Sequence, residues 1–337
     1  MSKKPNFRNV NVLLADSDAC LAQAVIHHLR AIGFVHITHV KSSTDAVRAI
    51  HSQPINFLIT EWDMKGSNGV ELVRYLRRSP DSPNRALPII MLTGRGELSD
   101  VQTARDVGIT EFVVKPFSAQ TLFNRIEQIV DSPRSFVVAN AYVGPERRRR
   151  GSPPPGLADR RTINPVPALP SRDGFLAPPG HPPTIFAPDA SLRMAMGTNK
   201  PLATVITAQI LQEAQKAIDD LGEASMQWIR DDLAAMQASF ATLKSSYSSH
   251  AVDTIKESAL TIKSRSGTFG YRMASDVARL LYLFLSTSFV PTNPRHLTVM
   301  EKHIQVLLVI FAQNIKEREG LGAELYTELE HLINVNK

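Results

Sequence analysis

The sequence predicts an α/β doubly wound domain at residues 8–131, followed by an all-α helical bundle at residues 201–337. Within the first region, short apolar runs alternate with amphipathic helical stretches over short connections, a pattern typical of a parallel sheet covered by helices. From about residue 202 onward, apolar residues recur with helical spacing, and several such helices with short turns favour an antiparallel bundle.

The region between these two domains has a different composition. Residues 131–200 contain 13 of the 22 prolines and an excess of five basic over acidic residues, including Arg147–Arg150, Arg160 and Arg161. Proline lacks an amide proton and fixes φ, which limits packing into a core. We therefore predict that residues 132–200 form a disordered linker rich in Pro and Arg. Its basic residues act either as a solvated tether or as a transient contact for acidic protein, RNA or lipid.

Composition also limits the compartment and the class of partner. The chain has one cysteine, Cys20, so no intrachain disulfide can form, and the longest apolar segments fall short of the roughly 18 residues that span a bilayer. These features predict a cytoplasmic protein without membrane insertion. The net charge of +6 comes largely from the linker and residues 201–337 are net acidic, so nucleic acid is not expected as a partner.

The first domain is predicted to contain five strands and five helices, each strand being followed by a helix. The strands are expected at Val10–Ala15, Val35–Val40, Asn56–Thr60, Pro88–Leu92 and Glu111–Val114, and the helices at Ala19–Ile32, Ser43–His51, Gly69–Arg78, Leu98–Val107 and Ser118–Val130.

Acidic residues follow two of these strands directly. Asp16 comes after the first strand, and Glu61 and Asp63 come after the third. In open α/β sheets, ligands bind beyond the carboxyl ends of the strands, so these carboxylates mark a candidate site.

Four motifs in this order, VLLADSD (12–18), FLITEWDMKGSNG (57–69), IIMLTG (89–94) and FVVKPF (112–117), resemble the receiver domain of two-component response regulators. The resemblance implies a flavodoxin-like sheet of five parallel strands in the order 2-1-3-4-5. It also implies transfer of a phosphoryl group from a histidine to an aspartate at the end of strand three, with help from Mg²⁺. The matching positions are Glu61 for the acceptor, Asp16 and Ser17 for the acidic pair, Thr93 for the hydroxyl, Lys115 for the lysine and Phe112 for the switch aromatic.

Two of these positions depart from the family pattern. Glu61 is one methylene longer than the expected aspartate, which moves its carboxylate outward by about 1.5 Å. In-line transfer depends on close placement of the nucleophile, so the rate should fall by orders of magnitude. Ser17 replaces a carboxylate that would bind the metal, so any Mg²⁺ held by Asp16 and Glu61 should bind weakly. No cofactor is expected with certainty.

Glu61 has two interpretations. Its carboxylate either stands in for part of a phosphoryl charge near Thr93 and Lys115, or it only pairs with Lys115 and fixes the loop. Asp63 and Asp18 are further carboxylates near the strand ends, but strand geometry points neither of them at the acceptor position.

The second domain is predicted to contain four or five helices. They are expected as one long or two stacked helices in Ala203–Ser246, followed by Val252–Ser266, Tyr271–Ser286, Leu297–Glu317 and Leu321–Val335.

Within it, SALTIKSRSGTFGYRMASDVARLL (258–281) resembles the histidine-phosphotransfer motif His-x-Leu-Lys-Gly with the small residues that follow it. On that resemblance, the phosphorylatable histidine falls at Leu260, the lysine at Lys263 and the glycine at Ser264. Ser266, Gly267 and Gly270 match the small residues that let a neighbouring helix approach. Leucine cannot accept a phosphoryl group, and an unrelated helical bundle remains the alternative. His303 is the best-placed substitute histidine, although an ordinary bundle histidine explains it as well.

These patterns indicate a bacterial-type phosphorelay protein that works by protein–protein interaction as a pseudo-receiver and is not an enzyme. Its expected partners are a histidine kinase, a phosphotransfer protein or another response regulator. The alternative is a phosphorylation-competent atypical regulator or phosphotransfer protein that uses Asp63, Asp18 or His303. A nucleic-acid-binding regulator is less well supported, because no helix-turn-helix pattern follows the receiver.

Overall fold

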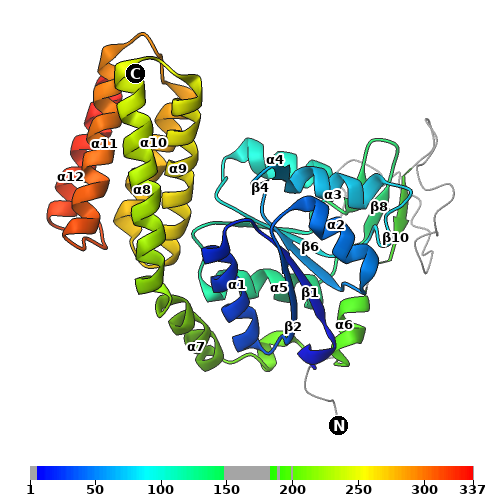
Figure 1. Cartoon of the computed structure of the whole chain (residues 1–337). Coiled ribbons are helices and arrows are strands. Elements are labelled where there is room, and N and C mark those ends of the chain that lie inside the picture. Colours follow the sequence, from blue (N-terminus) through cyan, green and yellow to red (C-terminus); the bar gives the residue numbers. More distant parts are fainter. Residues whose placement is uncertain (1–5, 148–182, 188–189, 199, 337) are drawn as a thin grey trace, which may run out of the picture. The chain divides into compact units, whose positions relative to one another are not determined.

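The computed structural model describes residues 6–147, 183–187, 190–198 and 200–336, and the side chains of Glu223, Ala224 and Ser225 are not described. The chain divides into two compact units, residues 1–114 with 119–214 and residues 115–118 with 215–337 (Figure 1).

The first unit contains a sheet of five parallel strands in the order β2-β1-β3-β6-β7. This is the predicted strand order, and it confirms the fold class of the N-terminal domain. The strands are β1 (Asn11–Ala15), β2 (His36–Val40), β3 (Phe57–Thr60), β6 (Ile89–Thr93) and β7 (Glu111–Val114). Every residue of the central strands β3 and β6 is buried, as expected for a parallel sheet covered on both faces.

Five helices follow the five strands. They are α1 (Ala19–Ile32), α2 (Ser43–Ser52), α3 (Gly69–Arg78), α4 (Leu98–Val107) and α5 (Ala119–Asp131). In Figure 1, α2, α3 and α4 lie above the sheet, and α1 and α5 lie below it. Their ends follow local rules: Asp18 caps α1 through the amides of Cys20 and Leu21, and the left-handed glycines Gly33 and Gly108 end α1 and α4.

The predicted linker at residues 132–200 is wrong at both ends. Phe136–Val138 (β8), Val143–Pro145 (β9) and Thr184–Phe186 (β10) form an antiparallel sheet in the order β10-β8-β9, and Ser191–Met196 form helix α6. The short runs FVV, TIF and SLRMAM supply enough apolar side chains to pack here, although the region as a whole is rich in proline. Arg148–Arg150, Arg160 and Arg161 lie outside the described residues.

Arg77 joins this small sheet to the receiver. Its guanidinium is fully buried and donates to the carbonyls of Gly108 (2.8 Å), Arg85 (2.6 Å) and Leu87 (2.9 Å). It also lies 5.5 Å from the ring centre of Phe136, a cation–π contact with β8. Burial lowers the pKa of Arg77 to about 9, which leaves the group charged at neutral pH. Because the same side chain holds three receiver carbonyls and also contacts Phe136 of β8, we infer that the small sheet is an integral part of this folded unit.

Helices make up the second unit. Ala208–Asp219 (α7) and Gly222–Ser245 (α8) occupy the region predicted as one long or two stacked helices, and the division between the two units falls within α7. The other helices are α9 (Ser249–Thr268), α10 (Arg272–Thr287), α11 (Pro294–Ala312) and α12 (Leu321–Val335). α11 ends at Ala312, five residues before the predicted end at Glu317, because Asn314 takes a left-handed conformation at φ 55°.

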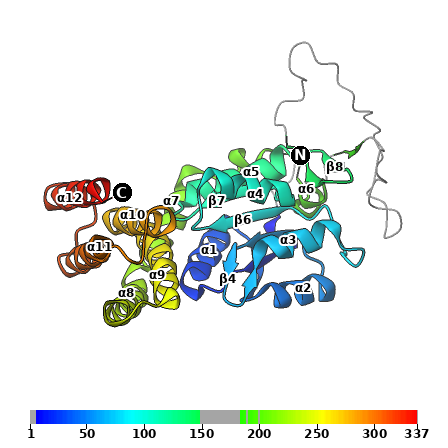
Figure 2. The same ribbon diagram turned by 90° about the horizontal axis from the view of Figure 1, so that it is seen from above.

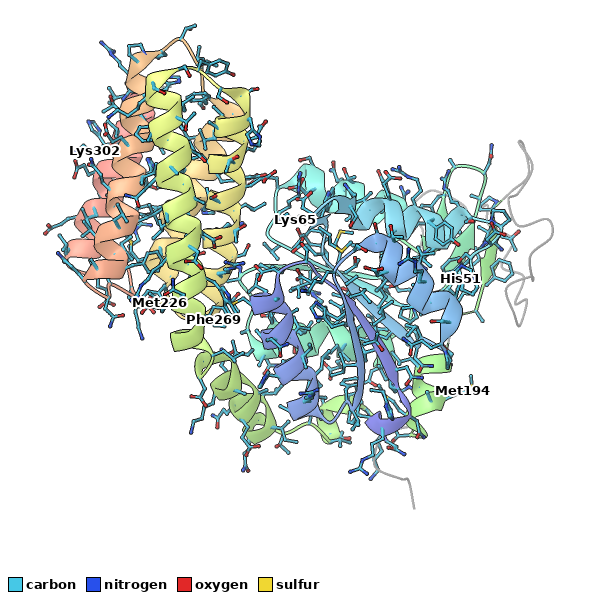
Figure 3. The ribbon with its side chains drawn as sticks, viewed as in Figure 1. His51, Lys65, Met194, Met226, Phe269 and Lys302 are labelled. Carbon is cyan, nitrogen blue, oxygen red and sulfur yellow. The ribbon has the colours of Figure 1, made fainter. Side chains whose placement is uncertain are left out.

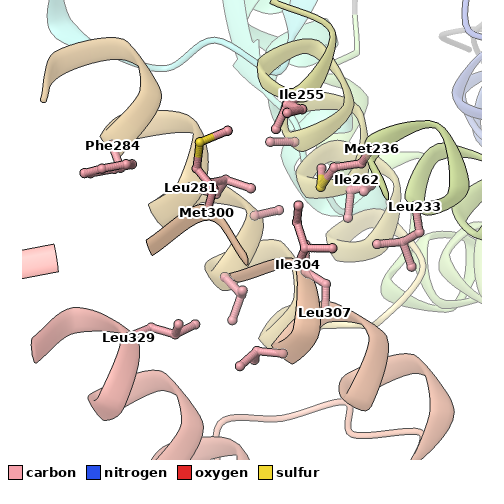
Figure 4. Packing of buried hydrophobic residues seen from close by; sticks show 14 of the residues in the cluster. Leu233, Met236, Ile255, Ile262, Leu281, Phe284, Met300, Ile304, Leu307 and Leu329 are labelled. Atoms are coloured by element: carbon pink, nitrogen blue, oxygen red, sulfur yellow. The ribbon is translucent and has the colours of Figure 1, made fainter. Parts of the chain in front are cut away.

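Helices α8 to α12 share one apolar core. Figures 1 and 2 show them side by side, and Figure 4 shows buried side chains from all five helices in contact. The labelled members include Leu233, Ile255, Leu281, Ile304 and Leu329. The apolar residues that recur at helical spacing throughout this region pack into this shared core. Among the described residues, no helix is both long and apolar enough to cross a membrane.

Candidate functional site

The predicted site residues of the receiver lie at the carboxyl edge of its parallel sheet. Asp16 follows β1, Glu61 follows β3, Thr93 ends β6 and Lys115 follows β7. Because β1, β3, β6 and β7 are consecutive in the sheet, their carboxyl ends line one edge of it. The structure therefore places Asp16, Glu61 and Thr93 at one edge of the sheet, as the sequence predicted.

The loop after β1 is held by its own side chains. Asp16 is buried, and its Oδ1 accepts the amide of Asp18 at 2.8 Å, while the Asp18 carboxylate caps α1. His39 on β2 binds the backbone carbonyl of Asp16 at 2.8 Å. Asp18 is thus used as a helix cap, which gives its carboxylate a structural role at the helix terminus.

Ser17, the residue that replaces an expected carboxylate, bonds to the opposite loop. Its Oγ accepts the backbone amide of Lys65 at 3.1 Å. Figure 3 labels Lys65 in the loop that follows β3. The hydroxyl therefore links the β1–α1 loop to the β3–α3 loop.

Glu61 is largely buried, at 8% exposure, and turns back on its own loop. Its Oε1 accepts the amide of Trp62 at 2.6 Å, and its amide donates to the Ala15 carbonyl at 2.8 Å. The extra methylene lets the carboxylate reach the amide of the next residue, and Glu61 has at least one further interaction.

Glycines make this loop compact. A Cβ on Gly69 would lie 1.9 Å from the Glu61 carbonyl oxygen, so any other residue would displace the acceptor loop. The short antiparallel strands β4 (Asp63–Met64) and β5 (Ser67–Asn68) precede it and turn at Gly66, whose φ is +72°. The sequence patterns did not predict this hairpin.

Thr93 is buried and its Oγ accepts the amide of Arg95 at 3.3 Å. In the described chain, Thr93 makes its side-chain hydrogen bond with the next loop and not with Glu61. Phe112 on β7 is partly buried and packs against the apolar core between the sheet and α2, α3 and α4. Lys115 is buried at 2% exposure and has interaction partners.

Asp63 is exposed. Its carboxylate binds Arg95 through two hydrogen bonds, Nε to Oδ2 at 2.5 Å and Nη2 to Oδ1 at 3.1 Å. Sequence reasoning missed Arg95. The only available signal was its place two residues after Thr93 in the loop that follows β6.

The residues present fit a divalent metal poorly. Oxygen atoms of Asp16, Ser17 and Glu61 each accept a backbone amide, and the described residues contain no group of three or more His, Cys, Asp or Glu side chains able to hold a metal ion. Mg²⁺ requires near-octahedral oxygen ligands, usually with carboxylate help, and a serine hydroxyl supplies no charge to offset the loss of water.

In the helical domain, the predicted motif residues lie along α9 and the turn after it. Leu260 is partly buried, Lys263 and Ser264 are buried, and Ser264 donates to the Leu260 carbonyl at 2.9 Å. Gly267 lies in the last turn of the helix. Gly270 follows α9 with φ +85°, a conformation that glycine permits for the turn into α10.

His303 lies in the core of the helical domain at 0% exposure. Its Nδ1 bonds to the Val299 carbonyl at 2.7 Å, its Nε2 has no partner within the described chain, and burial lowers its pKa to about 4. A phosphoryl donor has no access to such a ring, so the position does not support the alternative role for His303.

Comparisons with known proteins match the N-terminal part of this chain. Residues 12–127 match the family model of the response regulator receiver domain. The chemotaxis protein CheY of Pseudomonas aeruginosa is 31% identical over 122 residues, which are 36% of this chain and 97% of that protein. The chemotaxis protein CheY-3 of Vibrio cholerae is 26% identical over 124 residues, 37% of this chain and 94% of that protein. A solved structure of a putative response regulator from Chloroflexus aurantiacus is 28% identical, covers 36% of this chain and 96% of that one, and has a TM-score of 0.33.

The protein is therefore a receiver-domain protein: through residues 12–127, the chain belongs to the response regulator receiver family. Membership supports a place in two-component signalling. The matched residues end at 127, so the helical domain lies outside the family match.

Proposed function

We propose that this protein is a cytoplasmic pseudo-receiver that acts in a phosphorelay by protein–protein interaction and carries no phosphoryl group or enzymatic activity of its own. The observation that carries the proposal is the state of the acceptor position: Glu61 stands there, and its carboxylate accepts the amide of Trp62. A nucleophile that is both longer than aspartate and bound to its own loop is poorly placed for in-line attack on phosphorus.

The metal position supports the same proposal. Ser17 supplies a hydroxyl where a carboxylate is expected, and that hydroxyl accepts the Lys65 amide. With a weakened metal site, an incoming phosphoryl group would meet the negative charges of Asp16 and Glu61 with less shielding, which raises the barrier to transfer.

The helical domain, by its resemblance to histidine-phosphotransfer domains, is proposed to be a matching docking module without a phosphorylatable histidine. Leu260 occupies the histidine position, and Lys263 and Ser264 are the remnants of the motif. Its partners would be a histidine kinase, a phosphotransfer protein or a response regulator, with nucleic acid and membrane playing no part.

Two roles for Glu61 remain distinct within this proposal. If the carboxylate imitates phosphate, its charge sets the state that a partner recognises, and Glu61→Gln weakens partner binding by about 1–3 kcal/mol. If the carboxylate only fixes the loop, Glu61→Gln leaves the affinity unchanged. The Thr93 hydroxyl bonds to Arg95 and not to Glu61, which favours the structural role.

The proposal is tested by phosphotransfer from protein donors. The full chain is mixed with autophosphorylated histidine kinases and with phosphohistidine-carrying phosphotransfer proteins, and labelled phosphate on the chain is followed by gel electrophoresis. We expect no label on either domain. A label on the receiver would contradict the pseudo-receiver proposal, and a label on the helical domain would contradict the assignment of Leu260 to the histidine position.

The atypical phosphorylation-competent alternative receives less support from these residues. Asp63 is bound by Arg95, Asp18 caps α1 and His303 is fully buried.

A further inference from the structure

Arg95 connects three segments of the receiver beside the candidate site. It lies in the loop after β6, and its guanidinium forms the two-bond fork with Asp63 in the loop after β3. The same guanidinium lies 5.4 Å from the ring centre of Trp62. A forked arginine–carboxylate pair fixes both the distance and the relative orientation of the groups that it joins.

The contact continues into the first turn of α4. Arg95 Nη1 lies 4.0 Å from Oδ1 of Asp100, whose carboxylate in turn accepts the amide of Glu97 at 3.2 Å. Glu97 and Asp100 together form the capping box of α4. Leu98, the first residue of that helix, is 73% exposed. The position of Arg95 is thus coupled to the orientation of an exposed apolar residue at the start of α4.

The backbone of Arg95 contacts Thr93 of the candidate site. Its amide donates to the Thr93 hydroxyl, which the family resemblance assigns to sensing a phosphoryl group. One residue therefore contacts the sensing position through its backbone and the acceptor loop through its side chain.

We propose that Arg95 is a positioning residue that latches the β3–α3 loop to the β6–α4 loop and presents the first turn of α4 in one arrangement without any phosphoryl group. We call the Asp63–Arg95–Asp100 set the Arg95 latch. The inference deepens the proposed function and rests on it, because in a working receiver the phosphoryl group itself would connect these loops. Here the connection is built from side chains of the two loops and of α4.

Charge and exposure set the strength of the latch. Arg95 and Asp63 are 33% and 44% exposed, so water and salt screen the pair. An exposed ion pair of this kind is weak by itself, and its loss should change the loop-opening equilibrium by about two- to five-fold. This is a local effect that the fold tolerates, which makes it measurable in a folded variant.

The test uses the full chain carrying Trp228→Phe, so that Trp62 is the one tryptophan left of the two in the sequence. Arg95→Ala, Asp63→Asn and the charge swap Asp63→Arg with Arg95→Asp are compared. The matched control is Arg74→Ala, which removes an exposed arginine–carboxylate pair within α3 that joins no two loops. Acrylamide quenching of Trp62 and hydrogen exchange of the amides at residues 62–66 and 94–97 are measured.

We expect both single variants to raise quenching and exchange by about two- to five-fold, and the Arg74 control to change neither. The charge swap should restore quenching and the exchange of residues 62–66, but not of residues 94–97, because a carboxylate at position 95 repels Asp100. Unchanged exchange in Arg95→Ala, or a charge swap that combines the two single losses, would overturn the latch. These readouts need no phosphate, so phosphorylation of the chain would contradict the proposed function and leave the result on the latch standing.

Discussion

His303 makes the stability of the helical domain depend on pH. The ring lies fully within the core of α8–α12, with Nδ1 bonded to the Val299 carbonyl and Nε2 without a partner in the described chain. Burial lowers its pKa from 6.5 to about 4, because the charged ring has no water around it. Protonation therefore opposes folding.

The sign and the size follow from the two pKa values. Because the pKa is lowered on folding, the unfolded chain binds the proton first, and stability is complete above about pH 6.5 and falls as pH decreases toward 4. A difference of about 2.5 units corresponds to about 3 kcal/mol in total, of which about 2 kcal/mol is lost by pH 5. This is a large part of the stability of an ordinary domain.

The assay follows Trp228 fluorescence during urea unfolding of the full chain that carries Trp62→Phe, at pH 7.5 and pH 5. Trp228 lies in α8 and so reports on the helical domain. The same measurement on His303→Leu isolates the contribution of this ring, because the background of other groups is common to both proteins. The control is His250→Gln, which replaces an exposed histidine of α9.

Between pH 7.5 and pH 5, we expect the free energy of unfolding of His303→Leu to fall by about 2 kcal/mol less than that of its parent. The free energy of unfolding of His250→Gln should fall as much as that of the parent. An equal loss in His303→Leu and its parent, with the same fold by circular dichroism, would refute the reasoning about this buried ring.

The remaining predictions concern the first unit. His28 is likewise buried with its pKa lowered to about 4, so His28→Leu should reduce the loss of receiver stability between pH 6.5 and 4, read from Trp62 in the Trp228→Phe chain. Gly144→Ala should destabilise this unit by about 1–3 kcal/mol in urea, since its Cβ would lie 2.7 Å from the Cα of Gly108, whereas Gly222→Ala, with no neighbour within 4 Å, should not destabilise the chain. Arg77→Leu leaves three carbonyls without their charged donor and should lower the free energy of unfolding of this unit by about 3 kcal/mol or more. A loss below about 1 kcal/mol would show that β8 and β9 do not depend on Arg77.

The α/β fold could be predicted from sequence because its signals are local. The buried run Phe57–Ile59, the capping glycines and the alternation of strand and helix each fix a segment without knowledge of the rest. The same holds for Glu61 and Ser17, whose departures from the receiver motif are visible at single positions.

The missed features depend on contacts between distant residues. β8 and β10 are each three residues long and pair across 45 positions of the chain, so neither carries enough period-2 pattern to be recognised. Averaging composition over residues 131–200 hid them among the prolines. Arg95 was missed for a related reason, since its partner Asp63 lies 32 residues earlier in the chain.

Burial also argues against the alternative role predicted for His303. His303 is conspicuous as a histidine on a helix, and periodicity places it on a face without saying whether a donor can reach it. Only the packing of the neighbouring helices shows that the ring is enclosed.

The central claim is that the acceptor position has lost its chemistry through two side chains, and intact mass measurement tests it most directly. The full chain and its Glu61→Asp, Ser17→Asp double variant are incubated with acetyl phosphate and Mg²⁺. We predict no mass increase for the natural chain and a single added phosphoryl group for the double variant, because the variant restores the acceptor length and a metal-binding carboxylate. A phosphoryl group on the natural chain would contradict the account.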